Sequence, residues 1–166
     1  MAAKVILVSA CLLGVNTKYN GGNNLHAGVC QLQEKAILVP FCPEQLGGLS
    51  TPRDAAEIQS GDGHDVLAGR SKVKTKSNQD CTAAFLKGAQ ESLYIARKLQ
   101  AAGALVKARS PSCGSGYIYA GDFSGAVKIG DGVTAAAFKQ AGLPVFTEEE
   151  LEEFNLWLSF VSVKLL

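Results

Sequence analysis

Three of the five cysteines share a placement that suits chemistry better than packing. Cys11, Cys42 and Cys113 each follow an aliphatic run of strand length by a few residues, and each lies close to Gly or Pro. The runs are Val5–Val8, Ala36–Val39 and Ala104–Val106. If these runs are neighbouring parallel strands, their carboxyl ends share one edge of a sheet, which is where open α/β sheets bind ligands. The three sulfur atoms are then expected to converge on one site.

Three converging thiols need a positively charged partner. Thiolates held close together repel one another unless a cation neutralises them. Three sulfur ligands leave one position of a metal centre open, and an open position is typical of a catalytic rather than a structural site. Soft thiolate ligation favours zinc, copper(I) or an iron–sulfur cluster, and the pattern does not choose among them. The opposing interpretation is that Cys11, Cys42 and Cys113 are ordinary buried residues.

The other cysteines and both histidines receive structural interpretations. Cys30 lies among aliphatic residues of a predicted helix and Cys81 lies in the first turn of another, so we interpret each as a small buried hydrophobe. His26 and His64 stand in polar contexts away from the three cysteines discussed above. We therefore expect neither histidine to be a metal ligand.

The elements that must position the cysteines alternate along the chain. Hydrophobic patterns predict strands at 4–9, 36–40, 104–107 and 143–146, and helices at about 24–35, 80–102, 133–140 and from 147. The first of these helices is expected to bury Leu25, Val29 and Leu32, and Gly103 is expected to stop the second. Between 56 and 75, a small antiparallel excursion of two or three strands is predicted, with Asp65-Val66-Leu67 in one of them.

This alternation predicts the fold class. Strands that alternate with helices indicate an α/β protein, here a Rossmann-like three-layer sandwich with a short parallel sheet and a small antiparallel excursion. We expect one domain over residues 1–166, whose C-terminal helix begins at about Thr147 with that residue as its N-cap.

Charge and hydropathy exclude several kinds of partner. The formal net charge of +1 provides no field to attract polymeric nucleic acid or an anionic membrane. No apolar stretch reaches the roughly 18 uninterrupted residues of a spanning helix. The first residues lead directly into an apolar run that is too short for a signal-peptide core, so we expect a cytoplasmic protein with reduced thiols.

Five short motifs spread over nearly the whole chain, and three of them contain the cysteines. The motifs are Ser9-Ala10-Cys11-Leu12-Leu13-Gly14, Cys42-Pro43-Glu44-Gln45-Leu46-Gly47-Gly48-Leu49 followed by Thr51-Pro52-Arg53, Ser110-Pro111-Ser112-Cys113-Gly114-Ser115-Gly116, Gly121-Asp122-Phe123-Ser124-Gly125, and Gly130-Asp131-Gly132-Val133-Thr134. Together and in this order, they closely resemble the bacterial thiouracil desulfidase family. The resemblance is specific because it depends on several motifs rather than on one.

The resemblance implies a cofactor and a reaction. It implies a 4Fe-4S cluster held by Cys11, Cys42 and Cys113, with the fourth iron free to take the sulfur of a thiocarbonyl substrate. Such a cluster can be lost from protein purified in air. The implied reaction replaces the sulfur of a small-molecule thiolated base or nucleotide with oxygen from water, so that thiouracil gives uracil and sulfide. The motifs leave open whether the substrate is a 2-thio or a 4-thio compound.

The resemblance also implies two catalytic residues. Glu44 would move a proton between the attacking water and the substrate. Ser110 would position that water or donate a hydrogen bond to the substrate. The structural alternatives are that Glu44 binds amides of its own loop and that Ser110 orders the turn before Pro111.

Arg53 is the candidate contact for an anionic or carbonyl group of the substrate, because its loop departs from the Cys42 motif. Hydrogen bonding of Arg53 to loop carbonyls is the alternative. The chain departs from the family pattern at 77–82, where family members usually read Gly and then Asp-Val-Thr before the long helix. This departure puts substrate contact in doubt, since a helix N-terminus there could hold a phosphate. Residues 161–166 resemble nothing in the family, and we expect a loose tail or part of a subunit interface in a monomer or homodimer.

Two other functions compete with desulfidation. One is a non-catalytic zinc- or sulfide-binding domain that uses the same three cysteines. The other is a metal-free thiol enzyme with Cys113 as nucleophile, activated by a helix N-terminus. No histidine has an evident place beside Cys113, which weighs against the thiol enzyme.

Overall fold

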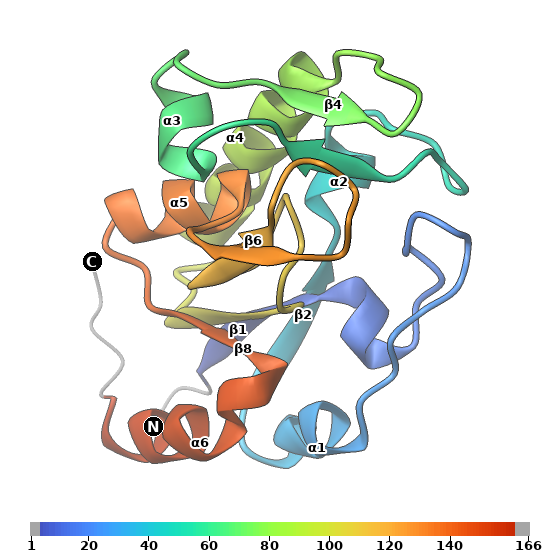
Figure 1. Cartoon of the computed structure of the whole chain (residues 1–166). Coiled ribbons are helices and arrows are strands. Elements are labelled where there is room, and N and C mark those ends of the chain that lie inside the picture. Colours follow the sequence, from blue (N-terminus) through green and yellow to red (C-terminus); the bar gives the residue numbers. More distant parts are fainter. Residues whose placement is uncertain (1–3, 162–166) are drawn as a thin grey trace.

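A computed structural model describes residues 4–161 and has a parallel sheet at its centre (Figure 1). The sheet contains β1 (Val5–Ser9), β2 (Ile37–Phe41), β5 (Gly103–Val106) and β8 (Val145–Thr147). Its strand order is β2-β1-β5-β8, and every neighbouring pair is parallel. Short aliphatic strands suit this position because helices cover both faces of a parallel sheet.

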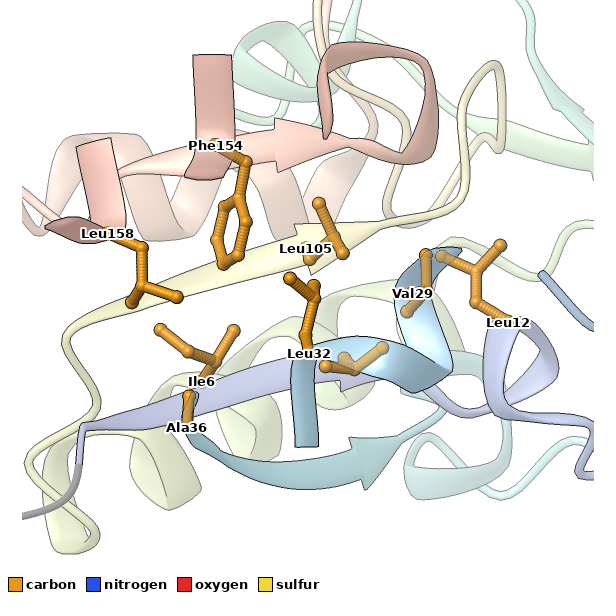
Figure 2. Packing of buried hydrophobic residues seen from close by; sticks show 9 residues of the cluster. Ile6, Leu12, Val29, Leu32, Ala36, Leu105, Phe154 and Leu158 are labelled. Carbon is orange, nitrogen blue, oxygen red and sulfur yellow. The ribbon is translucent and has the colours of Figure 1, made fainter. Parts of the chain in front are cut away.

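Helices form the two outer layers. On one face lie α1 (Ala27–Cys30) and α6 (Leu151–Phe160), and on the other lie α4 (Thr82–Lys98) and α5 (Val133–Gln140) (Figure 1). Figure 2 shows the first face, where Ile6 and Leu105 of the sheet pack with Phe154 of α6. On the second face, Leu7 and Val106 pack with Phe138 of α5. The predicted three-layer sandwich is therefore confirmed.

Two small antiparallel sheets flank the second face. In one, β3 (Ala56–Ile58) pairs with β4 (Val73–Thr75), and α3 (Gly63–Leu67) lies between them in the sequence. In the other, β6 (Tyr117–Tyr119) pairs with β7 (Val127–Ile129). A third buried cluster joins these sheets to the helices. Its members are Ile58, Val66, Val73, Cys81, Phe85, Ala89, Ile118, Val133 and Ala137.

Short helical segments complete the fold. They are η1 (Ala10–Leu13), η2 (Gln31–Glu34), α2 (Pro43–Leu46) and η3 (Glu148–Glu150). Of these, α2 packs directly on α4 through backbone atoms. A Cβ atom added at Gly47 would lie 2.0 Å from the carbonyl oxygen of Ala84, and one at Gly88 would lie 2.0 Å from that of Pro43. Only glycine fits at both positions, so the contact fixes α2 closely against α4.

The predicted elements are confirmed in outline and corrected in detail. The predicted helix at 24–35 is the short α1 followed by the 3-10 turn η2, and Leu25 is 63% exposed rather than buried. The Asp65–Leu67 segment is helical instead of extended, because Asp62 begins a capping box at the N-terminus of α3. The long helix ends at Lys98, and Gly103 is the first residue of β5.

The end of the chain agrees with the prediction as far as it is described. Thr147 forms a capping box with Glu150 ahead of α6. Apart from Val161, the expected tail at 161–166 lies outside the described residues. Within residues 4–161, none of the helices has both the length and the apolar character required to cross a bilayer.

Candidate functional site

A cavity of about 500 Å³ lies beside the carboxyl ends of three adjacent strands, and Cys11, Cys42 and Cys113 all line it. Cys11 lies in η1 directly after β1, Cys42 follows β2, and Cys113 lies in the loop after β5. The chain passes from β1 to β2 on one side and later returns to β5 on the other side of β1. The cavity therefore occupies a topological switch point, the usual ligand site of an open α/β sheet.

Local structure fixes each cysteine at the cavity. Cys42 is the N-cap residue of α2, and its sulfur lies 3.9 Å from the carbonyl oxygen of Thr17. Cys113 is buried, with its sulfur 3.2 Å from Oγ of Ser9. The same hydroxyl oxygen accepts a hydrogen bond of 3.0 Å from the backbone N–H of Lys107. Ser9 therefore links the end of β1 to the loop that carries Cys113.

Cys11 and Cys113 disfavour ionisation in the absence of a cation. Burial raises the pKa of Cys113 to about 11, and the charges of Cys11 and Cys42 contribute to the rise. Burial also raises the pKa of Cys11, against the effect of a hydrogen bond with Asn24, and Cys42 again contributes. The thiolate forms of Cys11 and Cys113 therefore become favourable at neutral pH only when a bound cation compensates their charge.

The chemistry of the donors bears on what they can hold. All three candidate ligands are cysteines that line one cavity. Iron–sulfur clusters are held by cysteine thiolates, so the three cysteines suit such a cluster. Among residues 4–161, the only His, Cys, Asp or Glu triad with all ligand atoms within 4.8 Å of one another is Asp62, His64 and Asp131, which do not line this cavity.

Glu44 lies in the same cavity wall, and both of its carboxylate oxygens have partners. One oxygen accepts a hydrogen bond from Nε of Arg53, and the other accepts one of 3.0 Å from the hydroxyl of Ser112. The Ser112 hydroxyl lies 3.0 Å from that of Ser110. These contacts form a chain from Arg53 through Glu44 and Ser112 to Ser110. Ser112 was missed in the sequence analysis, although its motif placed it beside Cys113.

Arg53 lines the cavity, but its guanidinium group is occupied. Besides Glu44, it donates to Oγ1 of Thr51 and to the carbonyl oxygen of Thr17, each at 2.9 Å. Its side chain is only 8% exposed. Direct contact between Arg53 and the substrate remains a prediction. The observed contacts show that Arg53 holds the carboxylate of Glu44 in its orientation.

Basic side chains surround the rest of the cavity. Lys18, Lys76, Lys107 and Arg109 all line it. Lys107 pairs with Glu148, and Arg109 pairs with Glu149 at 2.7 Å. Over the part of the chain that the structure describes, Lys18 and Lys76 form no ion pair.

The N-terminus of α4 lies outside this cavity. Asp80 Oδ1 accepts a hydrogen bond of 3.0 Å from the backbone N–H of Thr82, so a side-chain anion already occupies the helix end. Cys81 is buried, as expected for a small hydrophobe. Cys30, His26 and His64 also lie away from the cavity wall. Phosphate binding at the α4 N-terminus gains no support from this arrangement.

Comparisons with known proteins agree with one another. The model of the 2-thiouracil desulfurase family matches residues 6–150. The chain is 46% identical over 149 residues to the uncharacterized protein YbbK of Bacillus subtilis (strain 168), covering 90% of this chain and 99% of YbbK. A solved structure described as the [4Fe-4S]-dependent thiouracil desulfidase TudS aligns with a TM-score of 0.84 and 39% identity, over 95% of this chain and 99% of that one. The chain belongs to the 2-thiouracil desulfurase family.

Proposed function

We propose that this protein removes sulfur from a thiolated pyrimidine at a [4Fe-4S] cluster held by Cys11, Cys42 and Cys113. The observation that carries the proposal is that all three cysteines line one cavity at the switch point of the sheet. Both the family and the description of the solved relative support it. A cluster with three protein ligands supplies an iron with an open position, which acts as a Lewis acid toward a thiocarbonyl sulfur.

In this proposal, Glu44 is the general base. It takes a proton from the attacking water and returns it to the substrate as the carbon–sulfur bond breaks. Arg53 and Ser112 each hold one carboxylate oxygen, which restricts the side chain to one orientation. Fixed orientation matters because proton transfer requires the carboxylate to lie within hydrogen-bond distance of the water.

Ser110 is proposed to donate a hydrogen bond. Its hydroxyl oxygen accepts from the backbone N–H groups of Ser112 and Cys113, at 3.2 and 3.3 Å. With its oxygen accepting from both amides, the hydroxyl proton points away from them. That proton is available to Ser112 or to the substrate, and the same hydrogen bonds fix Ser110 beside the Cys113 backbone.

We also propose that the preferred substrate is a nucleotide rather than the free base. The cavity of about 500 Å³ must hold the cluster as well as the substrate, so the preference for a nucleotide rests on charge and not on volume. Lys18 and Lys76 offer positive charge at this cavity without an acidic partner among residues 4–161. A phosphate group would satisfy this charge, whereas a free base would not.

The test is turnover by protein reconstituted anaerobically with iron and sulfide. Loss of the substrate absorption band is followed for 2-thiouracil, 4-thiouracil and their nucleotides. We expect activity from wild type and from Cys30→Ala, which alters a cysteine outside the cavity, and none from Cys113→Ala. Full activity of Cys113→Ala would refute the proposal. Stoichiometric zinc without iron in anaerobically purified protein would favour the non-catalytic alternative.

A further inference from the structure

The turn Gly121-Asp122-Phe123-Ser124-Gly125 joins β6 to β7, and its central residue lines the cavity. Phe123 is half-buried, and the exposed Tyr119 at the end of β6 also lines the cavity. The reaction proposed above gives neither the turn nor Phe123 a role. The cavity wall nevertheless includes an aromatic ring in a site expected to receive a planar, aromatic substrate.

Glu57 holds this turn in place. Glu57 lies in β3, is only 7% exposed and also lines the cavity. One of its carboxylate oxygens accepts hydrogen bonds from the backbone N–H groups of Gly121, at 2.8 Å, and Phe123, at 3.0 Å. A buried carboxylate that binds two amides makes strong, charge-assisted hydrogen bonds. The turn is therefore attached to β3 at Phe123, a residue that lines the cavity.

The backbone of Phe123 has a conformation that phenylalanine rarely adopts. Its φ of 57° lies in the left-handed region, where glycine or asparagine is usual. Holding a bulky residue there costs free energy, and such strain persists where the surrounding structure enforces it, often at functional sites. The left-handed backbone of Phe123 therefore makes this residue a candidate for a functional role.

We infer that Phe123 is a substrate-binding residue that stacks on the pyrimidine ring, and that Glu57 is the positioning residue that holds it there. The inference rests on the proposed function, because that function supplies the planar ring. Stacking on an aromatic side chain contributes substantially to base binding and tolerates changes at the ring edge. Phe123 therefore serves 2-thio and 4-thio substrates alike.

The main test is Phe123→Gly in reconstituted enzyme. This change removes the ring and relieves the left-handed backbone, so thermal stability should not fall. We expect KM for thiouracil to rise about tenfold to a hundredfold with kcat largely kept. Phe123→Tyr should restore KM. The matched control is Tyr117→Ala, which removes an exposed ring from the same hairpin but outside the cavity wall and should leave KM unchanged.

Glu57 is tested by a graded pair of variants. Glu57→Ala leaves both amides without their acceptor and should raise KM nearly as much as Phe123→Gly. Glu57→Gln retains an oxygen acceptor and should recover much of the loss. A purely structural role of Glu57 would instead lower thermal stability and leave KM unchanged, which would overturn its assignment.

Two readouts separate this inference from the proposed function. Turnover by wild type with an unchanged KM in Phe123→Gly overturns the stacking role and leaves desulfidation intact. If the wild-type protein turns over no thiolated base, the proposed desulfidase function is refuted. The stacking role is then decided by calorimetric measurement of 2-thiouracil binding to the reconstituted wild-type and Phe123→Gly proteins. Weaker binding by Phe123→Gly than by wild type then supports it, and equal or absent binding by both overturns it.

Discussion

Two clusters of ionisable side chains in this protein differ in how their charge is balanced. One is formed by Asp62, His64 and Asp131, and an internal cation completes it. Lys139 Nζ lies 2.6 Å from one carboxylate oxygen of Asp131, and His64 Nε2 lies 3.2 Å from the other. Asp62 accepts hydrogen bonds from the backbone N–H groups of His64 and Asp131. This cluster needs no ion, because Lys139 already supplies the positive charge.

The cluster of Cys11, Cys42 and Cys113 is not balanced in this way. Its polar contacts include the Ser9 hydroxyl and the Thr17 carbonyl oxygen, and burial disfavours the thiolate forms of Cys11 and Cys113. Proximity of ligand-type side chains therefore does not by itself distinguish the two clusters. Their difference lies in whether the protein supplies a cation, and on that ground the cysteine cluster is the one predicted to bind a metal centre.

The largest expected effect separates the two clusters by iron content. Cys113→Ser should abolish cluster binding and reduce desulfidase activity at least about a thousandfold, because it removes one ligand and the Lewis acid with it. Asp131→Asn should retain the iron content of wild type. Iron and sulfide analysis after anaerobic reconstitution, together with visible absorbance, measures both. Iron loss in Asp131→Asn alone would reverse the assignment of the two clusters.

A second prediction compares the two carboxylate–cation pairs. Glu44 pairs with Arg53 at the cavity, and Asp131 pairs with Lys139 outside it. Glu44→Gln should lower kcat by roughly 10²–10⁴, the usual contribution of a general base, with iron content unchanged. Asp131→Asn should leave kcat near the wild-type value. Steady-state kinetics of protein matched for iron content measures the difference, and a kcat of wild-type size in Glu44→Gln would exclude it as the base.

A third prediction concerns the pH dependence of the thiols. In cluster-free protein, the raised pKa of about 11 keeps Cys113 protonated at neutral pH, and only the thiolate reacts with iodoacetamide. Between pH 7 and 9, its alkylation rate should rise about tenfold per pH unit, because the thiolate fraction rises in that proportion below the pKa. Peptide mass spectrometry measures the rate beside N-acetylcysteine. An alkylation rate of Cys113 that stops rising at about pH 8.5, the ordinary thiol pKa, would contradict the prediction.

The smallest expected effect is on stability. Burial works to raise the pKa of Asp131, but hydrogen bonds from Lys139 and the Gly116 amide and the charge of Lys139 together lower it. The ionised form therefore stabilises the fold, and Asp131→Asn should lower the free energy of unfolding by about 2 kcal/mol at pH 7. Because the pKa of Asp131 is lower in the folded than in the unfolded protein, this stabilisation is fully present above the unfolded-state pKa of about 4. It is lost as the pH falls through the lower, folded-state pKa. Denaturant unfolding of wild type and Asp131→Asn at pH 7 and pH 3 checks this prediction. A difference in the free energy of unfolding that is as large at pH 3 as at pH 7 would show that the charge of Asp131 is not its source.

Much of the fold could be predicted because its signals are local. Aliphatic runs identified the strands of the sheet, and the capping pattern at Thr147 identified the start of the last helical segment. Errors arose where side-chain contacts decide between alternatives. The Asp62 capping box makes 63–67 helical, although Asp65-Val66-Leu67 can also be read as a strand.

The site was predictable in part for a similar reason. Equivalent positions after parallel strands brought Cys11, Cys42 and Cys113 to one cavity, and their ligand role remains a prediction. Ser112 and Glu57 could not be assigned from spacing. Their roles depend on contacts with Glu44 and with the Phe123 turn across 68 and 66 residues of sequence.

The backbone contact between α2 and α4 limits how this enzyme can be altered. Gly47 and Gly88 have no room for even a methyl group, so any larger residue would separate the two helices. Because Glu44 lies in α2, the separation would displace its carboxylate from the position that Arg53 and Ser112 now hold. Variants designed to reshape the cavity should therefore leave Gly47 and Gly88 unchanged.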